Sequence, residues 1–306
     1  MARTKRARVA LAGYLFLLPN LLGFLAFTLI PVAVSLGLSF FEWDLFSGPK
    51  FVGFHNFSAL AHDHDFWRYA FNTVFLMLMI PVNILGSLFL AMVMNQKLRG
   101  IVVFRTIYFL PTIVMGVGTY LLWRWIYNPD YGPINAILAH WLPRWLNDGI
   151  GRLGVEWPPQ WLASVTWAKP ALMFMTFWTV VGGYNMILFL AALQGVSPEL
   201  YEAADIDGAN EWQKFRAITW PLVSPTTFFV FTMSLIGGLQ GGFDQAYVMT
   251  RGGPAGATTT ISYDIYNHAF AWNHMGYAAA MAWVLFTAVF AVTMVNWRFG
   301  GRIVHY

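Results

Sequence analysis

The sequence contains no cysteine and few charged residues. Without cysteine, disulfides, thiolate metal sites and thiol catalysis are all excluded. Charged residues make up 10% of the 306 residues and hydrophobic residues 58%. Soluble domains carry about 25% charged residues, so this deficit is large. A chain of this length with so little charge cannot form a surface polar enough to be stable in water. We therefore expect a lipid bilayer to be its solvent.

Common catalytic motifs are also missing. The chain has no G-x-x-x-x-G-K-[ST] phosphate loop, no H-E-x-x-H zinc motif and no G-x-S-x-G nucleophile elbow. We therefore predict no catalytic residues, and any ATP hydrolysis must come from another subunit. His62, Asp63, His64 and Asp65 are adjacent and carry metal-ligating groups, but a solvated turn is the favoured interpretation. No metal site is predicted.

Six long runs contain no Asp, Glu, Lys, Arg or His. A helix needs about 20 apolar residues to cross the hydrocarbon core, and all six runs qualify, the third with little to spare. The first run is too long for a cleaved signal peptide and no A-x-A site ends it, so we expect it to be retained. We predict an all-α integral membrane protein. It forms a single transmembrane domain, 1–306, with spans at about 10–41, 69–95, 104–127, 170–194, 221–247 and 274–298.

The basic residues are scattered between these runs, which argues against nucleic acid as a partner despite the net charge of +4. They indicate membrane orientation instead, because cytoplasmic segments are rich in Lys and Arg. With the N-terminus inside, cytoplasmic segments hold Arg3, Lys5, Arg6, Arg8, Lys97, Arg99, Arg105, Lys214, Arg216, Arg298 and Arg302. Outer segments hold only Lys50, Arg68, Arg124, Arg144, Arg152, Lys169 and Arg251. Both termini are therefore predicted to be cytoplasmic.

One cytoplasmic connection, 197–221, differs from the other short, basic ones. Ser197 and Pro198 favour the start of a helix, and Gly208 favours the turn that ends it. Asn210 and Gln213 have the spacing of a capping box, which predicts a second short helix. Two interpretations remain open at this point. The segment is either an ordinary loop folded over the inner face or a docking segment for another protein.

The spacing within this segment resembles a family motif. The pattern Glu-Ala-Ala-x3-Gly-x9-Ile-x-Leu-Pro is that of binding-protein-dependent ABC permeases, and the chain departs from it only with Trp220 in place of leucine. The matching positions are Glu202, Ala203, Ala204, Gly208, Ile218 and Pro221. Further segments at 95–111, 128–135, 243–260 and 276–280 resemble carbohydrate-uptake permeases, such as the maltose-type F subunit and the glycerol-phosphate A subunit.

The resemblance implies a type I ABC importer permease fold in the plasma (inner) membrane of a prokaryote. It implies several partners besides the lipid bilayer: two cytoplasmic ATP-binding subunits, a second permease subunit of a different chain, and an extracytoplasmic substrate-binding protein. ATP and Mg would be bound by the ATPase subunits, with no cofactor in this chain. The six matching positions of 197–221 would dock the ATPase, and the cargo would be a sugar, disaccharide, oligosaccharide or related polyol.

Candidate residues for the cargo path lie in the fourth and fifth spans, since polar residues inside spans are costly and often functional. They are Trp178, Tyr184, Asn185, Gly238, Gln240, Gly241, Gly242 and Asp244. Close helix packing would explain the glycines, and hydrogen bonds between helices would explain the amides. Asn83 in the second span is a weaker candidate.

Three other functions are weighed against sugar import. A permease for glycerol phosphate, or for amino acids or peptides, would share the same motif. An ion-coupled secondary transporter would need ionisable relays inside the spans, yet all six runs lack them and only Asp244 lies at an edge. A membrane enzyme is opposed by the missing catalytic motifs.

Overall fold

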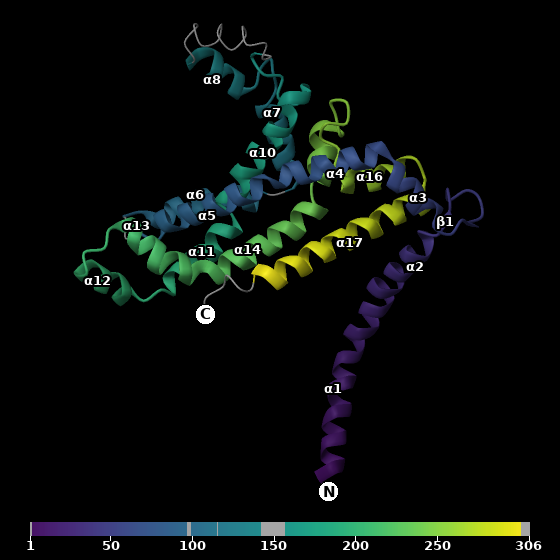
Figure 1. Cartoon of the computed structure of the whole chain (residues 1–306), viewed down its shortest axis with the longest axis horizontal. Helices are drawn as coiled ribbons and strands as arrows, with labels where there is room; N and C mark the ends of the chain where they lie inside the picture. The colour runs from purple at the N-terminus through teal and green to yellow at the C-terminus, as the bar shows by residue number, and fades with distance from the viewer. Residues whose placement is uncertain (1, 97–98, 115, 142–156, 301–306) are drawn as a thin grey trace. The chain divides into compact units, whose positions relative to one another are not determined.

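The computed structural model describes residues 2–96, 99–114, 116–141 and 157–300, and most of them lie in helices (Figure 1). The strands in this described part form one antiparallel pair, β1 (Phe41–Glu42) and β2 (Lys50–Phe51). The chain divides into two compact units. Unit 1 comprises 1–63 and 265–284, and unit 2 comprises 64–264 and 285–306.

Unit 1 begins with one long apolar helical stretch. It consists of α1 (Ala2–Phe24), the π-helix η1 (Leu25–Leu29) and α2 (Ile30–Leu38). This stretch contains the candidate membrane span Leu11–Leu38. In the most apolar part of that span, no residue is buried against the rest of the chain. An apolar helix that the chain itself leaves uncovered needs lipid or another subunit around it.

The rest of unit 1 packs around the β1–β2 hairpin. It comprises α3 (His55–His62), η4 (Asn267–Ala271) and the first part of α17 (Met275–Gly300). The buried Asn56 amide donates to the carbonyl oxygens of Ser39 (3.0 Å) and Phe41 (2.9 Å). The N–H of Met275 donates to Trp43 O at 3.0 Å. These bonds satisfy backbone groups that the short strands leave open.

Unit 2 contains the remaining spans. The helices of these spans are α4 (His64–Met77), α5 (Met79–Met94), α6 (Ile101–Ile113), α7 (Val117–Ile126), α10 (Val165–Val181), α11 (Tyr184–Gln194), α14 (Trp220–Gln240) and the end of α17. The shorter elements are α8 (Pro133–Trp141), α12 (Pro198–Ile206), α13 (Glu211–Lys214), η2 (Phe215–Thr219), α15 (Phe243–Gln245), η3 (Ala246–Thr250) and α16 (Ile261–Tyr266), which ends in unit 1.

The core of unit 2 lies where α5, α11 and α14 meet. Leu88 and Ala91 of α5 pack with Phe189 of α11 and with Val223 and Val230 of α14, and each is at most 2% exposed. Apolar side chains that face one another in this way leave little space between the helices. This packing fixes the positions of the elements that carry the two candidate sites.

The helices confirm the predicted all-α membrane fold. Five stretches in the described part are long and apolar enough to span a membrane, and the count becomes six if α6 and α7 form one broken span. The predicted fourth span is divided into α10 and α11 at Gly182–Gly183. The predicted fifth span, 221–247, ends as an α-helix at Gln240, because Gly241 is extended and Gly242 is left-handed (φ +83°).

Candidate functional site

The segment 197–221 forms a helical hairpin that continues through η2 into α14 (Figure 1). Its first helix, α12, begins at Pro198 after Ser197, as predicted, although the Ser197 hydroxyl bonds Glu199 (3.2 Å) instead of capping the backbone. At its other end, Ala209 N donates to Ala204 O (2.9 Å) and Gly208 N to Asp205 O (3.1 Å). These two bonds are the Schellman pattern, which needs a left-handed residue at Gly208 (φ +75°).

The second helix of the hairpin, α13, begins with the predicted capping box. Asn210 Oδ1 accepts from Gln213 N (3.0 Å), and Gln213 Oε1 accepts from Asn210 N (2.8 Å). Lys214 ties this helix to the first, with its Nζ 2.8 Å from Asp205 Oδ1 and 2.5 Å from Glu211 Oε1. The hairpin is therefore closed by contacts between residues close in sequence.

The hairpin presents apolar side chains outward. Ile206 is 87% exposed and Trp212 is 67% exposed. Beside Trp212 lies a cavity of about 480 Å³, lined by Met92, Tyr201, Glu211, Trp212, Lys214, Phe215 and Thr219. Large side chains left uncovered around a hollow are typical of a surface that binds another protein.

The structure places the six matching positions of the motif along this hairpin. Glu202, Ala203 and Gly208 are exposed, and Ala204 supplies the carbonyl that closes the turn. Ile218 lies half-buried in η2 and Pro221 in the first turn of α14. The hydroxyl groups of Tyr201 and Thr219 are 2.9 Å apart and connect α12 to η2. Their docking role stays a prediction.

A second candidate site is a cavity of about 420 Å³ between the spans of unit 2. It is lined by Thr73, Leu76, Met77, Met79, Ile80, Asn83, Thr176, Val180, Ser234, Gly237, Gly238, Gly241, Gly242, Gln245 and Thr260. None of these lining side chains is charged. The cavity thus offers hydroxyl and amide groups beside apolar walls, a combination that suits an uncharged polar ligand group.

The predicted path residues divide into two groups. Gly238, Gly241 and Gly242 line the cavity. The residues that do not line it are Trp178, Tyr184, Asn185, Gln240 and Asp244. In the fourth span the break at Gly182–Gly183 starts a new helix at Tyr184. The Tyr184 side chain is 64% exposed and its ring meets Phe109 edge-on at 5.7 Å.

The fourth span reaches the cavity through other residues, Thr176 and Val180. Thr176 Oγ1 accepts from Gln245 Nε2 at 3.1 Å, which connects α10 to α15. Neither Thr176 nor Gln245 was predicted, since a hydroxyl in an apolar run commonly bonds its own helix, as Thr176 also does to Leu172 O. Only the three-dimensional contact identifies them as cavity residues.

Asn83, the weaker candidate, also lines this cavity. It is 6% exposed, and within the described part of the chain its Oδ1 has no hydrogen-bond partner. A buried amide oxygen without a partner costs about 1–3 kcal/mol, so a ligand or water that donates to it would be favoured. In the same cavity, Gly238 lets α14 approach α4 closely, since an added Cβ at Gly238 would lie 2.9 Å from Met77 Cγ.

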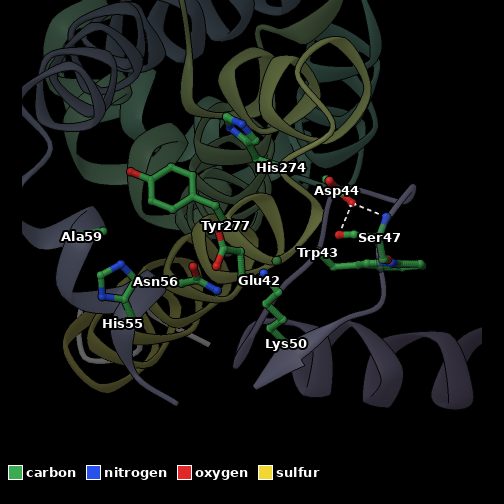
Figure 2. Close-up of a pocket in the computed structure, with 11 residues that line it drawn as sticks. Glu42, Trp43, Asp44, Ser47, Lys50, His55, Asn56, Ala59, His274 and Tyr277 are labelled. Atoms are coloured by element: carbon green, nitrogen blue, oxygen red, sulfur yellow. Dashed lines mark hydrogen bonds between the residues drawn. The ribbon is translucent and has the colours of Figure 1, made fainter. Parts of the chain in front are cut away.

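Unit 1 contains a separate hollow of about 440 Å³ that no predicted site residue lines. Figure 2 shows Asp44 and Ser47 at its edge, with Asn56, Tyr277 and His274 across from them. Asp44 Oδ1 accepts from Ser47 Oγ (2.7 Å), Ser47 N (2.7 Å) and Phe46 N (3.0 Å). These bonds hold the pKa of Asp44 below its usual value, because they stabilise the charged carboxylate.

Comparison with known proteins agrees with these features. Residues 74–302 match the family described as "Binding-protein-dependent transport system inner membrane component". The probable ABC transporter permease YesP of Bacillus subtilis is 35% identical, over 97% of this chain and 92% of its own. The lactose transport system permease LacF of Rhizobium radiobacter is 35% identical, over 97% of both chains. The glycerol-3-phosphate permease UgpA of Yersinia enterocolitica is 33% identical, over 96% and 95%.

A solved structure has the same fold. It belongs to a bacterial ABC transporter involved in the import of the acidic polysaccharide alginate, and it aligns over 100% of both chains with a TM-score of 0.81 at 24% identity. The family match covers most of the chain, including the hairpin 197–221 and every lining residue of the cavity except Thr73. The chain belongs to the family of binding-protein-dependent transport system inner membrane components.

Proposed function

We propose that this chain is a pore-forming permease subunit of an ATP-driven importer for sugars, namely oligosaccharides, disaccharides or related polyols. Family membership and the names of its relatives support this cargo class, since they include lactose and arabinooligosaccharide permeases. A permease for glycerol phosphate is the alternative, supported by the likeness to UgpA. The chain itself acts without a catalytic step, and the partner subunits bind ATP and Mg.

The hairpin of α12 and α13 carries this proposal. Its backbone is closed by the Schellman bonds at Gly208 and by the Asn210 capping box, so the hairpin can act as a rigid lever. Ile206 and Trp212 project from it without cover. In the proposed assembly these side chains enter a cleft of the cytoplasmic ATPase, and movement of that cleft is passed through η2 into α14.

The cavity between the spans is the proposed cargo path. Asn83, Thr176 and Gln245 would bond sugar hydroxyls, while Gly238 and the Gly241–Gly242 pair keep space for the ring. A transporter then opens such a site to each side of the membrane in turn.

Two further partners belong to the proposed assembly. A second permease, of a different chain, would complete the pore, and an extracytoplasmic binding protein would deliver the cargo. A solved relative with TM-score 0.79 is described in complex with a periplasmic protein that holds an alginate pentasaccharide.

The proposed orientation places the inner-membrane protein with both termini in the cytoplasm. Since the chain has no cysteine, a single introduced cysteine is a unique label. Ile206→Cys should react with a membrane-impermeant maleimide only from the cytoplasmic side, and Phe46→Cys only from outside. Both side chains are about equally exposed, at 87% and 86%. The opposite labelling pattern would overturn the orientation.

ATP dependence tests the function itself. The complete transporter, reconstituted in vesicles with its ATPase subunits, second permease and binding protein, should import sugar when ATP is supplied on the ATPase side. Import should persist when proton and sodium gradients are collapsed. Import that is driven by an ion gradient and does not depend on ATP would instead support the secondary-transporter alternative.

The labelling variant also tests the docking role of the hairpin. When the ATPase subunits are bound, Ile206→Cys should no longer react with the maleimide.

A further inference from the structure

Lys169 lies in the first turns of α10 and is held against two aromatic rings of α4. Its Nζ is 5.4 Å from the centroid of the Phe71 ring and 5.1 Å from that of Phe75. A cation over a ring face is attracted by the negative π-cloud, an interaction worth about 0.5–2 kcal/mol. The rings thus fix the position of the ammonium group without neutralising its charge.

No acidic side chain compensates this charge within the described residues. Among the described residues no ion pair is found for Lys169, whereas Lys214 in α13 pairs with Asp205 and Glu211. The charged neighbour of Lys169 is Arg68 of α4, which lies near enough to repel it. One Arg68 nitrogen donates to the carbonyl oxygen of Ala255, which leaves other guanidinium N–H groups for a ligand. Two cations therefore meet at one place, and an anion there would relieve their repulsion.

Lys169 lies on the helix face that leads to the cavity between the spans. Thr176 and Val180 line that cavity and follow Lys169 by seven and eleven residues, which places all three on one face of α10. At a rise of 1.5 Å per residue, Lys169 is about 10 Å along the helix from Thr176. In the proposed orientation this is the outer end of the path. None of the described residues that line the cavity is charged.

We infer that the cargo carries a negatively charged group, a carboxylate or a phosphate, which pairs with Lys169 and Arg68 at the outer end of the path. This inference rests on the proposed function and narrows its cargo from sugars in general to acidic sugars or phosphorylated polyols. The hydroxyl groups of the same cargo would meet Asn83, Thr176 and Gln245 in the cavity. A structural role for Lys169, with its ammonium reaching the lipid headgroups, is the alternative.

The test uses the complete transporter in vesicles with its own ATPase subunits, second permease and binding protein. Import is measured for three cargo sets: uronic-acid oligosaccharides, sn-glycerol 3-phosphate and neutral oligosaccharides. We expect ATP-dependent import of one acidic set, and the set that is imported identifies carboxylate or phosphate as the charged group. Lys169→Gln should lower import at limiting cargo about 10–100-fold, the range expected when a charged hydrogen bond is lost. Lys169→Arg should restore most of it.

Lys50→Gln is the matched control, since it removes the same charge from an outer residue in unit 1 and should leave import unchanged. Protein yield and elution volume in detergent show whether each variant has folded. Import of neutral oligosaccharides alone would overturn the inference and leave the proposed function standing. An unchanged rate for Lys169→Gln with an acidic cargo would overturn it in favour of the headgroup role. An assembled, ATP-hydrolysing complex that imports none of the three sets would contradict the proposed function as well.

Discussion

The hairpin 197–221 and the cavity between the spans are built in opposite ways. The hairpin is closed by bonds between near neighbours, such as Ala209 N to Ala204 O, and it turns its largest apolar side chains outward. The cavity is formed by residues far apart in sequence, such as Thr73, Thr176 and Thr260, and depends on how closely helices approach. The difference indicates a division of labour. In the proposed function the local motif serves as a docking surface, whereas the cavity, which changes with every neighbouring helix, is matched to the cargo.

The largest effect on stability is expected at the edge of the cavity. Gly242 has φ +83°, and an added Cβ would lie 2.6 Å from Thr260 Cγ2, a buried atom. Gly242→Ala combines backbone strain with a clash and should cost about 2–4 kcal/mol, measured as thermal unfolding in detergent. Gly237→Ala is the control, because a Cβ there meets nothing within 4 Å. Equal stability of the two variants would show that the cavity does not depend on close packing.

In the hairpin the largest effect should fall on binding and spare the fold. Ile206→Ser removes a side chain that is 87% exposed, so unfolding should be nearly unchanged. If Ile206 is buried in the ATPase, its loss should weaken binding by about 1.5–3 kcal/mol, or about 10–100-fold. The dissociation constant for the ATPase subunits measures this. Phe46→Ser changes a residue that is 86% exposed on the side proposed to be outer, and it should leave this dissociation constant unchanged. Equal effects of both variants would contradict the docking role.

The capping box allows a smaller change in the same hairpin. Asn210→Ala removes the acceptor for Gln213 N and should destabilise the start of α13 by about 1 kcal/mol. ATPase activity stimulated by cargo-loaded binding protein should fall several-fold, since the lever is loosened but remains present. Asn128→Ala removes a similar side-chain bond, to Asp130 N and Tyr131 N, in a different turn. That variant should leave the stimulation intact, and an identical loss from both would indicate a general effect on folding.

The smallest expected effect concerns pH and the segment around His268 in unit 1. Burial, with His274 nearby, lowers the pKa of His268 to about 4, although Asp63 opposes the shift. Because the folded state favours neutral His268, its contribution to stability is complete above about pH 6.5 and is lost as the pH falls towards 4. Hydrogen exchange at 267–277, corrected for intrinsic rates, should therefore increase between pH 7 and pH 5.

Two controls accompany this pH prediction. His268→Gln should remove the pH dependence, since glutamine does not titrate. The hairpin 197–221 contains no histidine, so its corrected exchange should stay constant over the same range. A parallel change in both segments would mean that the whole chain loosens, and the local explanation from His268 would fail.

These regions also differ in how far the sequence alone predicts them. Helical content and the number of spans follow from charge-free runs, because the bilayer imposes one requirement on every residue of a span. The turn at Gly208 and the box at Asn210 and Gln213 were predicted correctly, because their bonds join residues within six positions of one another.

The cavity could be predicted only in part. Gly238, Gly241 and Gly242 were predicted as residues of the cargo path, with close helix packing as the alternative explanation, and all three line the cavity. Tyr184 and Asn185 were assigned to it but are not among its lining residues, since the break at Gly182–Gly183 redirects the helix. An added Cβ at Gly183 would lie 2.6 Å from Thr112 Oγ1 of α6, so the break depends on a tertiary contact. No local pattern encodes that contact, and the same holds for the pairing of Thr176 with Gln245.

The central claim is that the hairpin around Gly208 couples this chain to an ATPase. At Gly208 (φ +75°) an added Cβ meets nothing within 4 Å, so a substitution acts through backbone strain alone. The decisive measurement is ATPase activity stimulated by cargo-loaded binding protein in the reconstituted complex. Gly208→Val should abolish the stimulation while membrane insertion stays normal, and Gly208→Asn should keep most of it, because asparagine tolerates the left-handed region. Normal stimulation of the Gly208→Val complex would contradict the account.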